Sequence, residues 1–279
     1  NWGGSWVTDL SNGQNFDFSL PAELPTGSRC LAGHWITTTT LTYVCETGTV
    51  QNPTGLIRYV ATIGEWIARR TTDNSALVTG SVFLAKDGHW ASYMPATRIA
   101  KDNAILVSGG TGGSMSMSGN TVVHACNNEN TTICVRNGNT LSKTIVPQVP
   151  FYETATNNGY ILYGGSGNMR GVTPSGADTS KKIGSFGFEG KPVIFFVKGV
   201  AWIATSVEDR TNPSSFKTYV ILRPWDSKSA IVIGTGSDAT GATSLDVVFD
   251  GTNFVVAYNA TNGVLKVVTV AENATRTQF

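Results

Sequence analysis

The sequence predicts an all-β chain folded as a β-propeller-like array of about six small antiparallel sheets. No segment keeps an apolar period of about 3.6 residues for more than about three turns, so long helices are not expected. Short runs of Val, Ile, Thr, Tyr, Phe and Trp instead alternate with clusters of Gly, Asn, Asp and Ser. This pattern is typical of short strands joined by tight turns, and the spacing of the turn glycines indicates repeated units.

Several turns share one form, in which a strand ends at a turn containing glycine and an aromatic or β-branched residue starts the next strand. Primed hairpin turns need positive φ, which glycine adopts without steric cost. The glycines interpreted in this way are Gly33, Gly64, Gly88, Gly119, Gly159, Gly199 and Gly251. Successive members lie 31, 24, 31, 40, 40 and 52 residues apart. Steps near 40 suit a four-stranded unit, and the step of 24 predicts that Gly64 and Gly88 share one unit.

The clearest unit spans residues 193–236. Its four expected strands are 193–197, 201–207, 217–224 and 230–234. A radial array hides most strand edges, which favours a propeller over a single closed barrel. A jelly roll or a tandem β-sandwich also has many short strands with glycine turns, and the irregular spacing leaves that alternative open. No Pro- or Ser-rich linker divides the chain, so we expect one all-β domain over residues 1–279.

The composition excludes several classes of protein. Hydrophobic residues make up 41% of the chain, which is enough for a buried core and excludes intrinsic disorder. Lys and Arg total 20 against 19 Asp and Glu, so no basic excess is present to hold nucleic acid phosphates. No apolar run reaches the roughly 18 residues of a membrane span, and the strongest, 193–204, is interrupted by Lys198 and Gly199. The chain opens at Asn1 without an initiating Met or a signal peptide, so we expect a processed or trimmed product.

Four cysteines fall in two close pairs that each bracket an expected hairpin. We expect disulfides between Cys30 and Cys45 and between Cys126 and Cys134. The alternative is a metal site formed by His124, Cys126 and Cys134, which offers three ligands where structural zinc takes four. The sequence therefore favours disulfides and predicts no metal.

Three N-glycosylation sequons agree with an oxidising compartment. They begin at Asn130, Asn259 and Asn273, and each lies in an expected turn or in the tail. A chain rich in Asn and Thr also produces such sequons by chance. Together with the cysteine pairs, they predict an extracellular, secreted or particle-surface location.

Most enzymatic motifs fail on inspection. Residues 234–239 match the dinucleotide pattern G-x-G-x-x-A, but a strand-like segment follows in place of the required helix. Residues 164–168 approach a nucleophile elbow, yet Asn168 replaces the final glycine and no helix is expected after it. His34 and His89 lie beside turn glycines, where a structural role is favoured over catalysis. We predict no cofactor and expect a non-enzymatic protein.

A propeller-type glycoside hydrolase is the enzymatic alternative. Such enzymes place two carboxyl groups around a pocket, one protonated and one ionised. The candidates on strands near the predicted inner edges of the sheets are Glu153, Asp246 and Glu208, and Asp226 is less favoured. The aspartate-box pattern of sialidases, S-x-D-x-G-x-T, has one near match at 237–243, but its Asp is shifted by one place. That single match does not indicate a sialidase.

Aromatic residues provide the other functional signal. Trp and Tyr rings pack against sugar C–H surfaces, and neighbouring polar side chains bind hydroxyls. Four tryptophans recur at one place in the repeat, which predicts packing between sheets; these are Trp35, Trp66, Trp90 and Trp202. The candidate ligand-binding residues are Trp225, Tyr160 and Tyr258, and Trp225 is placed at the surface because it lies in a polar turn beside Pro224.

We expect a non-enzymatic recognition protein of the extracellular space or a particle surface, binding a glycan or a protein receptor. No nucleic acid partner and no membrane span are expected, and an oligomer is compatible with the sequence. The alternatives are the glycoside hydrolase and a structural or attachment protein of a virus particle. The low charged fraction of 14% and the abundance of Thr, Ser and Asn suit this last class.

Overall fold

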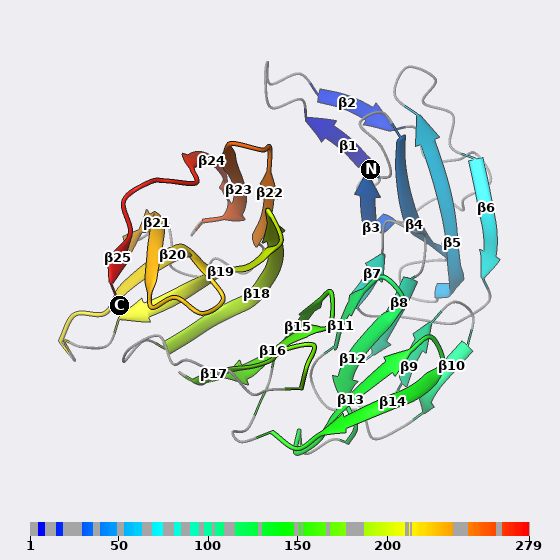
Figure 1. Cartoon of the computed structure of the whole chain (residues 1–279). Helices are drawn as coiled ribbons and strands as arrows, with labels where there is room; N and C mark the ends of the chain where they lie inside the picture. Colours follow the sequence, from blue (N-terminus) through cyan, green and yellow to red (C-terminus); the bar gives the residue numbers. More distant parts are fainter. Residues whose placement is uncertain are drawn as a thin grey trace. The chain divides into compact units, whose positions relative to one another are not determined.

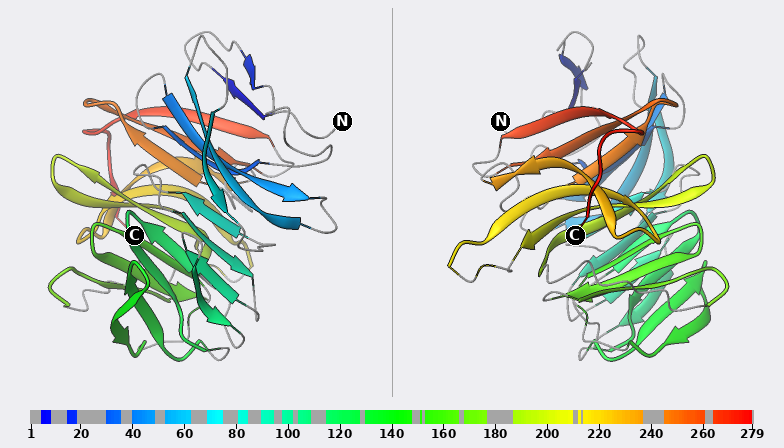
Figure 2. Two further views of the ribbon diagram at one scale, coloured as in Figure 1. Left: turned by 90° about the vertical axis from the view of Figure 1, so that its right-hand side faces the viewer. Right: turned by 60° about the vertical axis from the view of Figure 1, so that its left-hand side comes forward.

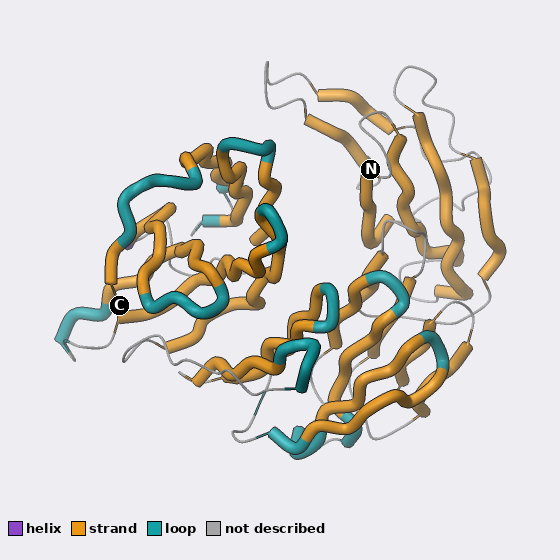
Figure 3. Tube along the Cα trace, in the orientation of Figure 1, coloured by secondary structure: helices purple, strands orange, loops and turns teal. Residues whose placement is uncertain are grey.

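The computed structural model of the chain consists of β-strands joined by turns (Figure 1). It describes residues 5–8, 15–18, 30–35, 40–48, 53–62, 69–74, 81–84, 90–94, 98–101 and 104–108, and then 115–278 except 128–129, 148–150, 152, 166–167, 177–186, 210–211, 213, 237–244 and 261–263. Over these ranges the tube in Figure 3 is strand and loop, without an α-helix. The all-β prediction is confirmed.

The chain divides into two compact units. The first comprises residues 1–111, 119–122 and 136–142, and the second comprises 112–118, 123–135 and 143–279. The expectation of a single domain over 1–279 stays a prediction.

The first unit begins with a two-stranded ribbon, in which β1 (Ser5–Thr8) pairs with β2 (Asn15–Phe18). Two antiparallel four-stranded sheets follow, each with its strands in sequence order. The first contains β3 (Cys30–Trp35), β4 (Thr40–Gly48), β5 (Pro53–Thr62) and β6 (Arg69–Asn74). The second contains β7 (Ser81–Leu84), β8 (Trp90–Met94), β9 (Arg98–Lys101) and β10 (Ala104–Ser108).

Four further sheets follow along the chain, with consecutive strands side by side (Figures 1 and 2). The first has residues in both units and contains β11 (Met115–Ser118), β12 (Thr121–Ala125), β13 (Ile133–Asn137) and β14 (Thr140–Ile145). The next contains β15 (Glu153–Asn157), β16 (Tyr160–Gly165) and β17 (Asn168–Val172). The third contains β18 (Gly187–Val197), β19 (Val200–Asp209), β20 (Lys217–Pro224), β21 (Ser229–Thr235) and the C-terminal β25 (Thr277–Gln278). The last contains β22 (Leu245–Phe249), β23 (Asn253–Asn259) and β24 (Leu265–Ala271).

The predicted hairpins of the second half are confirmed by the strands and by backbone geometry. The four strands expected within 193–236 lie inside β18, β19, β20 and β21. The turn glycines between first and second strands have positive φ: 53° at Gly119, 80° at Gly159, 81° at Gly199 and 104° at Gly251. Glycine is needed there because side chains with a Cβ rarely adopt this conformation.

Two predictions about the early glycines are wrong. Gly33 is not in a turn, because β3 continues through it to Trp35 and pairs Gly33 with Tyr43 of β4. Gly64 and Gly88 themselves lie outside the described residues. The strands that flank position 64 in sequence, β5 and β6, and those that flank position 88, β7 and β8, belong to different sheets, so the expectation of one shared unit is wrong. The spacing of 24 residues misled the count because one glycine follows the third strand of its sheet and the other follows the first.

The sheet formed by β18 to β21 is covered on both faces by different sheets. Strand alternation sends Ile203 to one face and Trp202 to the other. The first face packs against β15–β17 in a cluster of Ala155, Leu162, Met169, Ile194, Ala201, Ile203 and Trp225. The second face packs against β22–β24 in a cluster that includes Leu222, Ile231, Phe254, Val256 and Tyr258. A two-sheet sandwich would leave one of these faces to solvent, so this packing supports the propeller-like array over the sandwich alternative.

The first strands of these sheets lie next to one another, and polar side chains connect them. The Ser116 hydroxyl of β11 donates to Thr154 Oγ1 of β15 at 3.3 Å, and Ser118 donates to Asn157 Oδ1 at 3.2 Å. Asn157 Nδ2 in turn donates to the carbonyl of Ile194 in β18 at 2.7 Å. Packing between the sheets removes water from these polar side chains. The hydrogen bonds between strands replace the partners that water would have supplied.

Candidate functional site

Trp225, the strongest ligand-binding candidate of the sequence, is buried instead of exposed. It follows β20 in the turn before β21, and only 5% of its surface is accessible. Its backbone N–H donates to the Ala201 carbonyl at 2.8 Å, and its ring lies over Gly171 of β17. Because Gly171 has no side chain, the indole fits between two sheets. The predicted surface position of Trp225 is therefore wrong.

A buried arginine holds the turn that carries Trp225. Arg223 is only 3% exposed, and its Nη1 donates to the carbonyls of Trp225 at 2.7 Å, Ser227 at 3.1 Å and Pro224 at 3.3 Å. Burial lowers the pKa of Arg223 to about 10, against the opposing influence of Asp226, so the guanidinium keeps its charge at neutral pH. Sequence reasoning missed Arg223. The available signal was its spacing from Ile221. Residues two apart on a strand have side chains on the same face, so Arg223 lies on the same covered face of β20 as Ile221.

The two tyrosine candidates also contribute to packing between sheets. Tyr160 is half-buried and meets Trp225 and Phe196 edge-to-face, with ring centroids 5.0 Å and 5.6 Å away. Tyr258 is 2% exposed and its phenol lies against Gly234 of β21. The rings of Trp225 and Tyr258 are buried in protein and the ring of Tyr160 is partly covered, so ligand binding by these residues stays a prediction without structural support.

The candidate carboxylates lie on three different sheets. Glu208 is 8% exposed on β19 and pairs in register with Thr218. Asp246 is exposed on β22, where its Oδ1 accepts the backbone N–H of Val247 at 2.8 Å. Glu153 is on β15 opposite Gly164, and its side chain is outside the described part. Asp226 lies beside Arg223. Glu153, Glu208 and Asp246 lie on strands of three different sheets, so the fold does not place any two of them on the same sheet. Among the described residues, no group of three His, Cys, Asp or Glu could hold a metal ion.

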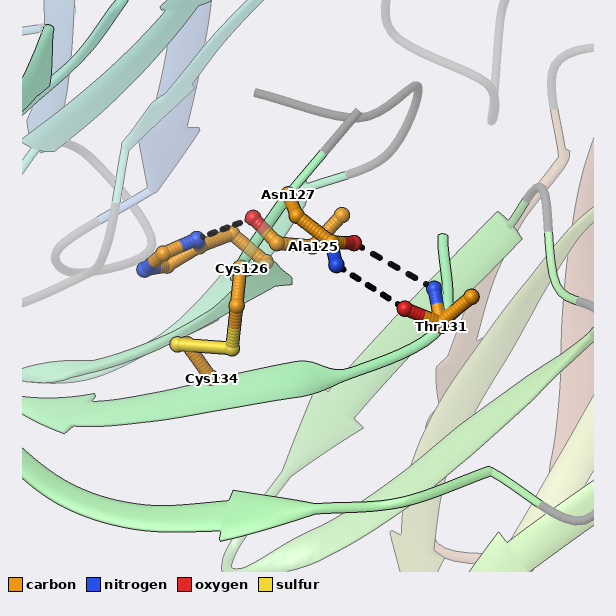
Figure 4. Close-up of a disulfide and its surroundings, with 6 residues drawn as sticks. Ala125, Cys126, Asn127, Thr131 and Cys134 are labelled. Carbon is orange, nitrogen blue, oxygen red and sulfur yellow. Dashed lines mark hydrogen bonds between the residues drawn. A yellow bond between two sulfur atoms is a disulfide. The ribbon is translucent and has the colours of Figure 1, made fainter. Parts of the chain in front are cut away.

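The second cysteine pair forms a disulfide across β12 and β13 (Figure 4). The Cα atoms of Cys126 and Cys134 are 5.2 Å apart. The loop between them is closed by Asn127, whose Nδ2 donates to Thr131 Oγ1 at 2.8 Å and whose Oδ1 accepts the Thr131 N–H at 3.3 Å. Sulfurs bonded to each other cannot serve as thiolate ligands, so the metal site with His124 is excluded in this state. In the first unit, Cys45 is disulfide-bonded and its register partner is Cys30.

The three sequon asparagines differ in exposure. Asn130 is half-buried with φ of 53°, and Asn259 is half-buried at the end of β23. Asn273 is exposed in the turn after β24, and Thr275 of the same sequon is also exposed. Glycosylation of these sites stays a prediction.

An exposed apolar sheet face is the feature of the second unit that sequence reasoning did not single out. The face of β22–β24 that points away from the core is called the open face and carries Asp246, Val248, Asn253, Val255, Ala257, Asn259, Leu265, Val267, Thr269 and Ala271. Val248 is 62% exposed, Leu265 61% and Val267 40%. Across the strands Val248 pairs with Val255 and Ala257 with Val267, so the aliphatic side chains are adjacent. Clustered exposed side chains of this kind mark interaction sites more often than isolated ones do.

The chain matches no family model and no curated protein sequence. Solved structures of propeller proteins share its fold. Hsv2 of Kluyveromyces lactis has a TM-score of 0.57 at 10% identity, with 99% of this chain and 92% of that chain covered. A chain of the mitotic checkpoint complex has a TM-score of 0.55 at 10% identity, with 96% and 85% covered. Sqt1 of Saccharomyces cerevisiae has a TM-score of 0.55 at 9% identity, with 96% and 78% covered. These likenesses support the propeller-like fold.

Proposed function

We propose that this protein is a non-enzymatic binding or scaffold propeller that recognises a protein partner through the open face. The observation that carries the proposal is the exposure of Val248, Leu265 and Val267 on one sheet face whose opposite side is core. Burying such a face against a partner removes aliphatic surface from water, which is the dominant favourable contribution to most protein association.

The chemistry of the open face fits a protein better than a glycan. Sugars are bound mainly by stacking on aromatic rings, with hydrogen bonds from nearby polar groups. Most described side chains of the open face are aliphatic and none is aromatic, and the rings of Trp225, Tyr160 and Tyr258 are engaged in the packing between sheets. A protein partner offers complementary aliphatic side chains.

Asp246 gives the proposed partner one further property. It is the only charged residue among the described positions of the open face, because Lys266 lies on the opposite side of β24, in register with Tyr258. A partner that buries this face must pair or solvate the Asp246 carboxylate, since an unpaired buried charge is costly. We infer that the partner is a protein with an apolar surface and a Lys or Arg that pairs with Asp246.

We infer an extracellular, secreted or particle-surface location from the disulfides. Cysteine pairs of this kind persist in oxidising compartments and are rare where glutathione keeps thiols reduced. Among the described residues the structure has no helix long and apolar enough to cross a membrane.

Selection of a phage-displayed random peptide library on the folded protein tests the function. Selected peptides should combine aliphatic residues with Lys or Arg, and should lose at least about tenfold in affinity on Val248→Lys and Val267→Lys variants. Val200→Lys is the matched control, because Val200 is 52% exposed in the β18–β19 hairpin, away from the open face. Peptides that bind all three variants equally, or strong binding on a glycan array, would overturn the proposal.

The stability of the Val248→Lys and Val267→Lys variants shows whether the open face is already covered by another part of the same chain. A Lys on a face that is free in the isolated protein should change the free energy of unfolding by no more than about 0.5 kcal/mol. A larger loss, comparable to a core substitution, would mean that the face is already covered within one chain, which contradicts the proposal. If light scattering shows that the unmodified chain is a dimer and that Val248→Lys dissociates it, the partner at the open face is a second copy of this chain.

A further inference from the structure

The C-terminal segment leaves its own sheet and attaches to the neighbouring one. After β24 the chain turns, with the Ala274 N–H donating to the Ala271 carbonyl at 3.0 Å, and runs to the edge of β21 (Figures 1 and 2). There Thr277 pairs with Ala230 and Gln278 with Ser229 in an antiparallel register. The tail therefore forms the fifth strand of a sheet to which it is not adjacent in sequence.

The main side-chain anchor of the tail is an arginine over a tryptophan. The guanidinium carbon of Arg276 lies 5.0 Å from the centroid of the Trp202 ring. The Trp202 ring also packs against Phe254 and Phe195, with ring centroids 4.8 Å and 6.3 Å away, and Trp202 is 3% exposed overall. A guanidinium over an indole is attracted by the ring quadrupole, so Arg276 covers the part of Trp202 that the core leaves accessible.

The start of the tail has a second, more exposed anchor. Glu272 Oε2 accepts a hydrogen bond from Lys198 Nζ at 2.7 Å, and the two side chains are 29% and 67% exposed. The same ammonium lies 5.8 Å from the centroid of the Phe249 ring. Exposed ion pairs contribute little because water and salt screen them. This anchor orients the turn after β24 without fixing the strand beyond it.

The tail occupies only a small part of the edge available to it. Two register pairs attach β25, and residues 275–278 are exposed. On the other side β21 pairs with β20 as far as Thr235, but no described strand pairs with residues 231–235 along the free edge. A strand with unpaired backbone groups is a template for another extended chain.

We propose that the free edge of β21 is a strand-acceptor site for an extended, arginine-bearing segment of a protein partner, and that the tail occupies it in the free protein. The proposal rests on the protein-binding function proposed above but uses a different surface. Continuing the register of β25 places the residue of the partner that corresponds to Arg276 opposite Ile231, which belongs to the same core cluster as Trp202. The partner's arginine then replaces Arg276 over the indole, and the residues that precede it pair along 232–235.

Peptide binding to the full chain tests the acceptor site. The probe is a fluorescein-labelled peptide with the sequence of residues 271–279, and the tail is released by combining Arg276→Ala with Thr277→Pro, because proline removes a backbone donor from the pairing strand. The released variant should bind the probe saturably and at least about tenfold more tightly than the unmodified chain, whose own tail competes. A probe with Gln in place of its Arg should bind at least about tenfold more weakly.

Hydrogen exchange locates the bound peptide. The backbone amides within residues 229–235 that point away from β20 should exchange more slowly in the complex, since strand addition gives those amides new acceptors. If the released variant fails to fold, excess probe is added to the unmodified chain, where it should accelerate exchange at Thr277 and Gln278 by displacing the tail. A folded released variant without saturable binding, protection confined to other strands, or unchanged exchange of the tail under excess probe would each overturn the acceptor site.

The open-face variants distinguish failure of this site from failure of the proposed function. Val248→Lys should leave binding of the tail probe unchanged, because the open face lies on a different sheet from β21. Loss of library peptides with retained probe binding would reject the open face alone. Loss of probe binding with retained library peptides would reject the β21 edge alone.

Discussion

Trp225 lies directly over Gly171, so that a methyl group at position 171 would overlap the indole. The contact joins the turn after β20 to the middle of β17 and closes one of the clusters between sheets. Arg223 maintains the geometry by binding three carbonyls of the same turn. A position that the sequence assigned to ligand binding is therefore part of the framework of the second unit.

Replacing Gly171 by Ala should destabilise the protein by about 1–3 kcal/mol, because the new methyl group overpacks the site. The measurement is the midpoint of denaturant unfolding. In a Trp225→Leu background the same Gly171→Ala change should cost much less, and the difference is the coupling energy of the pair. Equal costs in both backgrounds would show that the indole is not what limits position 171.

Replacing Arg223 by Met should also destabilise the protein, by about 1–3 kcal/mol at neutral pH. The substitution keeps the length of the side chain but leaves the carbonyls of Trp225 and Ser227 without their buried donor. Denaturant unfolding of the variant measures the loss. A variant as stable as the parent would mean that the hydrogen bonds only offset the cost of burying the charge.

The pKa of Arg223 adds a pH signature to that comparison. Burial lowers this pKa from its ordinary value to about 10, so between pH about 10 and that ordinary value the folded state has lost the proton that the unfolded state still binds. Stability of the parent relative to Arg223→Met should therefore rise as the pH increases through this window and stay constant below it. A relative stability that falls above pH about 10 would contradict the cause assigned to the shift.

Sequence alone predicted the parts of this fold that depend on local signals. The strand 217–224 coincides with β20, and the Asn158-Gly159 and Asp250-Gly251 turns have the positive φ at glycine that these dipeptides favour. Gly33 failed because a glycine beside an aromatic residue is equally compatible with a strand that continues, as β3 does.

The position of Trp225 was beyond such reasoning for a different reason. The space it fills is created by a glycine 54 residues earlier in the chain, and a polar turn sequence does not reveal that partner. The alternation of Val247 and Val248 does predict one inward and one outward side chain in β22. Alternation alone cannot tell whether another sheet covers the outward side, so the open face required the structure.

The disulfides predict that the protein has no free thiol when isolated under oxidising conditions. Alkylation of the unfolded, unreduced chain followed by intact mass measurement should add no label, and labelling after reduction should add four, one for each cysteine. Replacing Cys126 and Cys134 by Ala should cost about 2–3 kcal/mol through the entropy of the short loop in the unfolded chain. Four labelled thiols before reduction, or a native mass that includes zinc, would contradict this state.

Lys198 adopts φ of 48°, a conformation that asparagine tolerates better than lysine. Lys198→Asn should therefore leave stability unchanged or raise it by up to about 0.5 kcal/mol, since the exposed pair with Glu272 contributes little. Lys198→Ala loses the pair without easing the turn and is the control, with an expected loss of up to about 0.5 kcal/mol. If Lys198→Asn costs as much as Lys198→Ala, the ion pair is more important than its exposure indicates.

The turn glycines allow the repeat itself to be tested. Val at Gly159, Gly199 or Gly251 should cost at least about 1–2 kcal/mol each, because a β-branched residue fits positive φ badly. At Gly199 and Gly251 no atom lies within 4 Å of where a Cβ would be, so the cost there is conformational and not steric.

Thr252→Val is the matched control, since Thr252 is an exposed residue of the same turn as Gly251 and its replacement keeps the shape of the side chain. Denaturant midpoints of the three glycine variants should fall together and well below that of the control. Variants as stable as Thr252→Val would mean that these turns do not require the conformation from which the repeat was inferred.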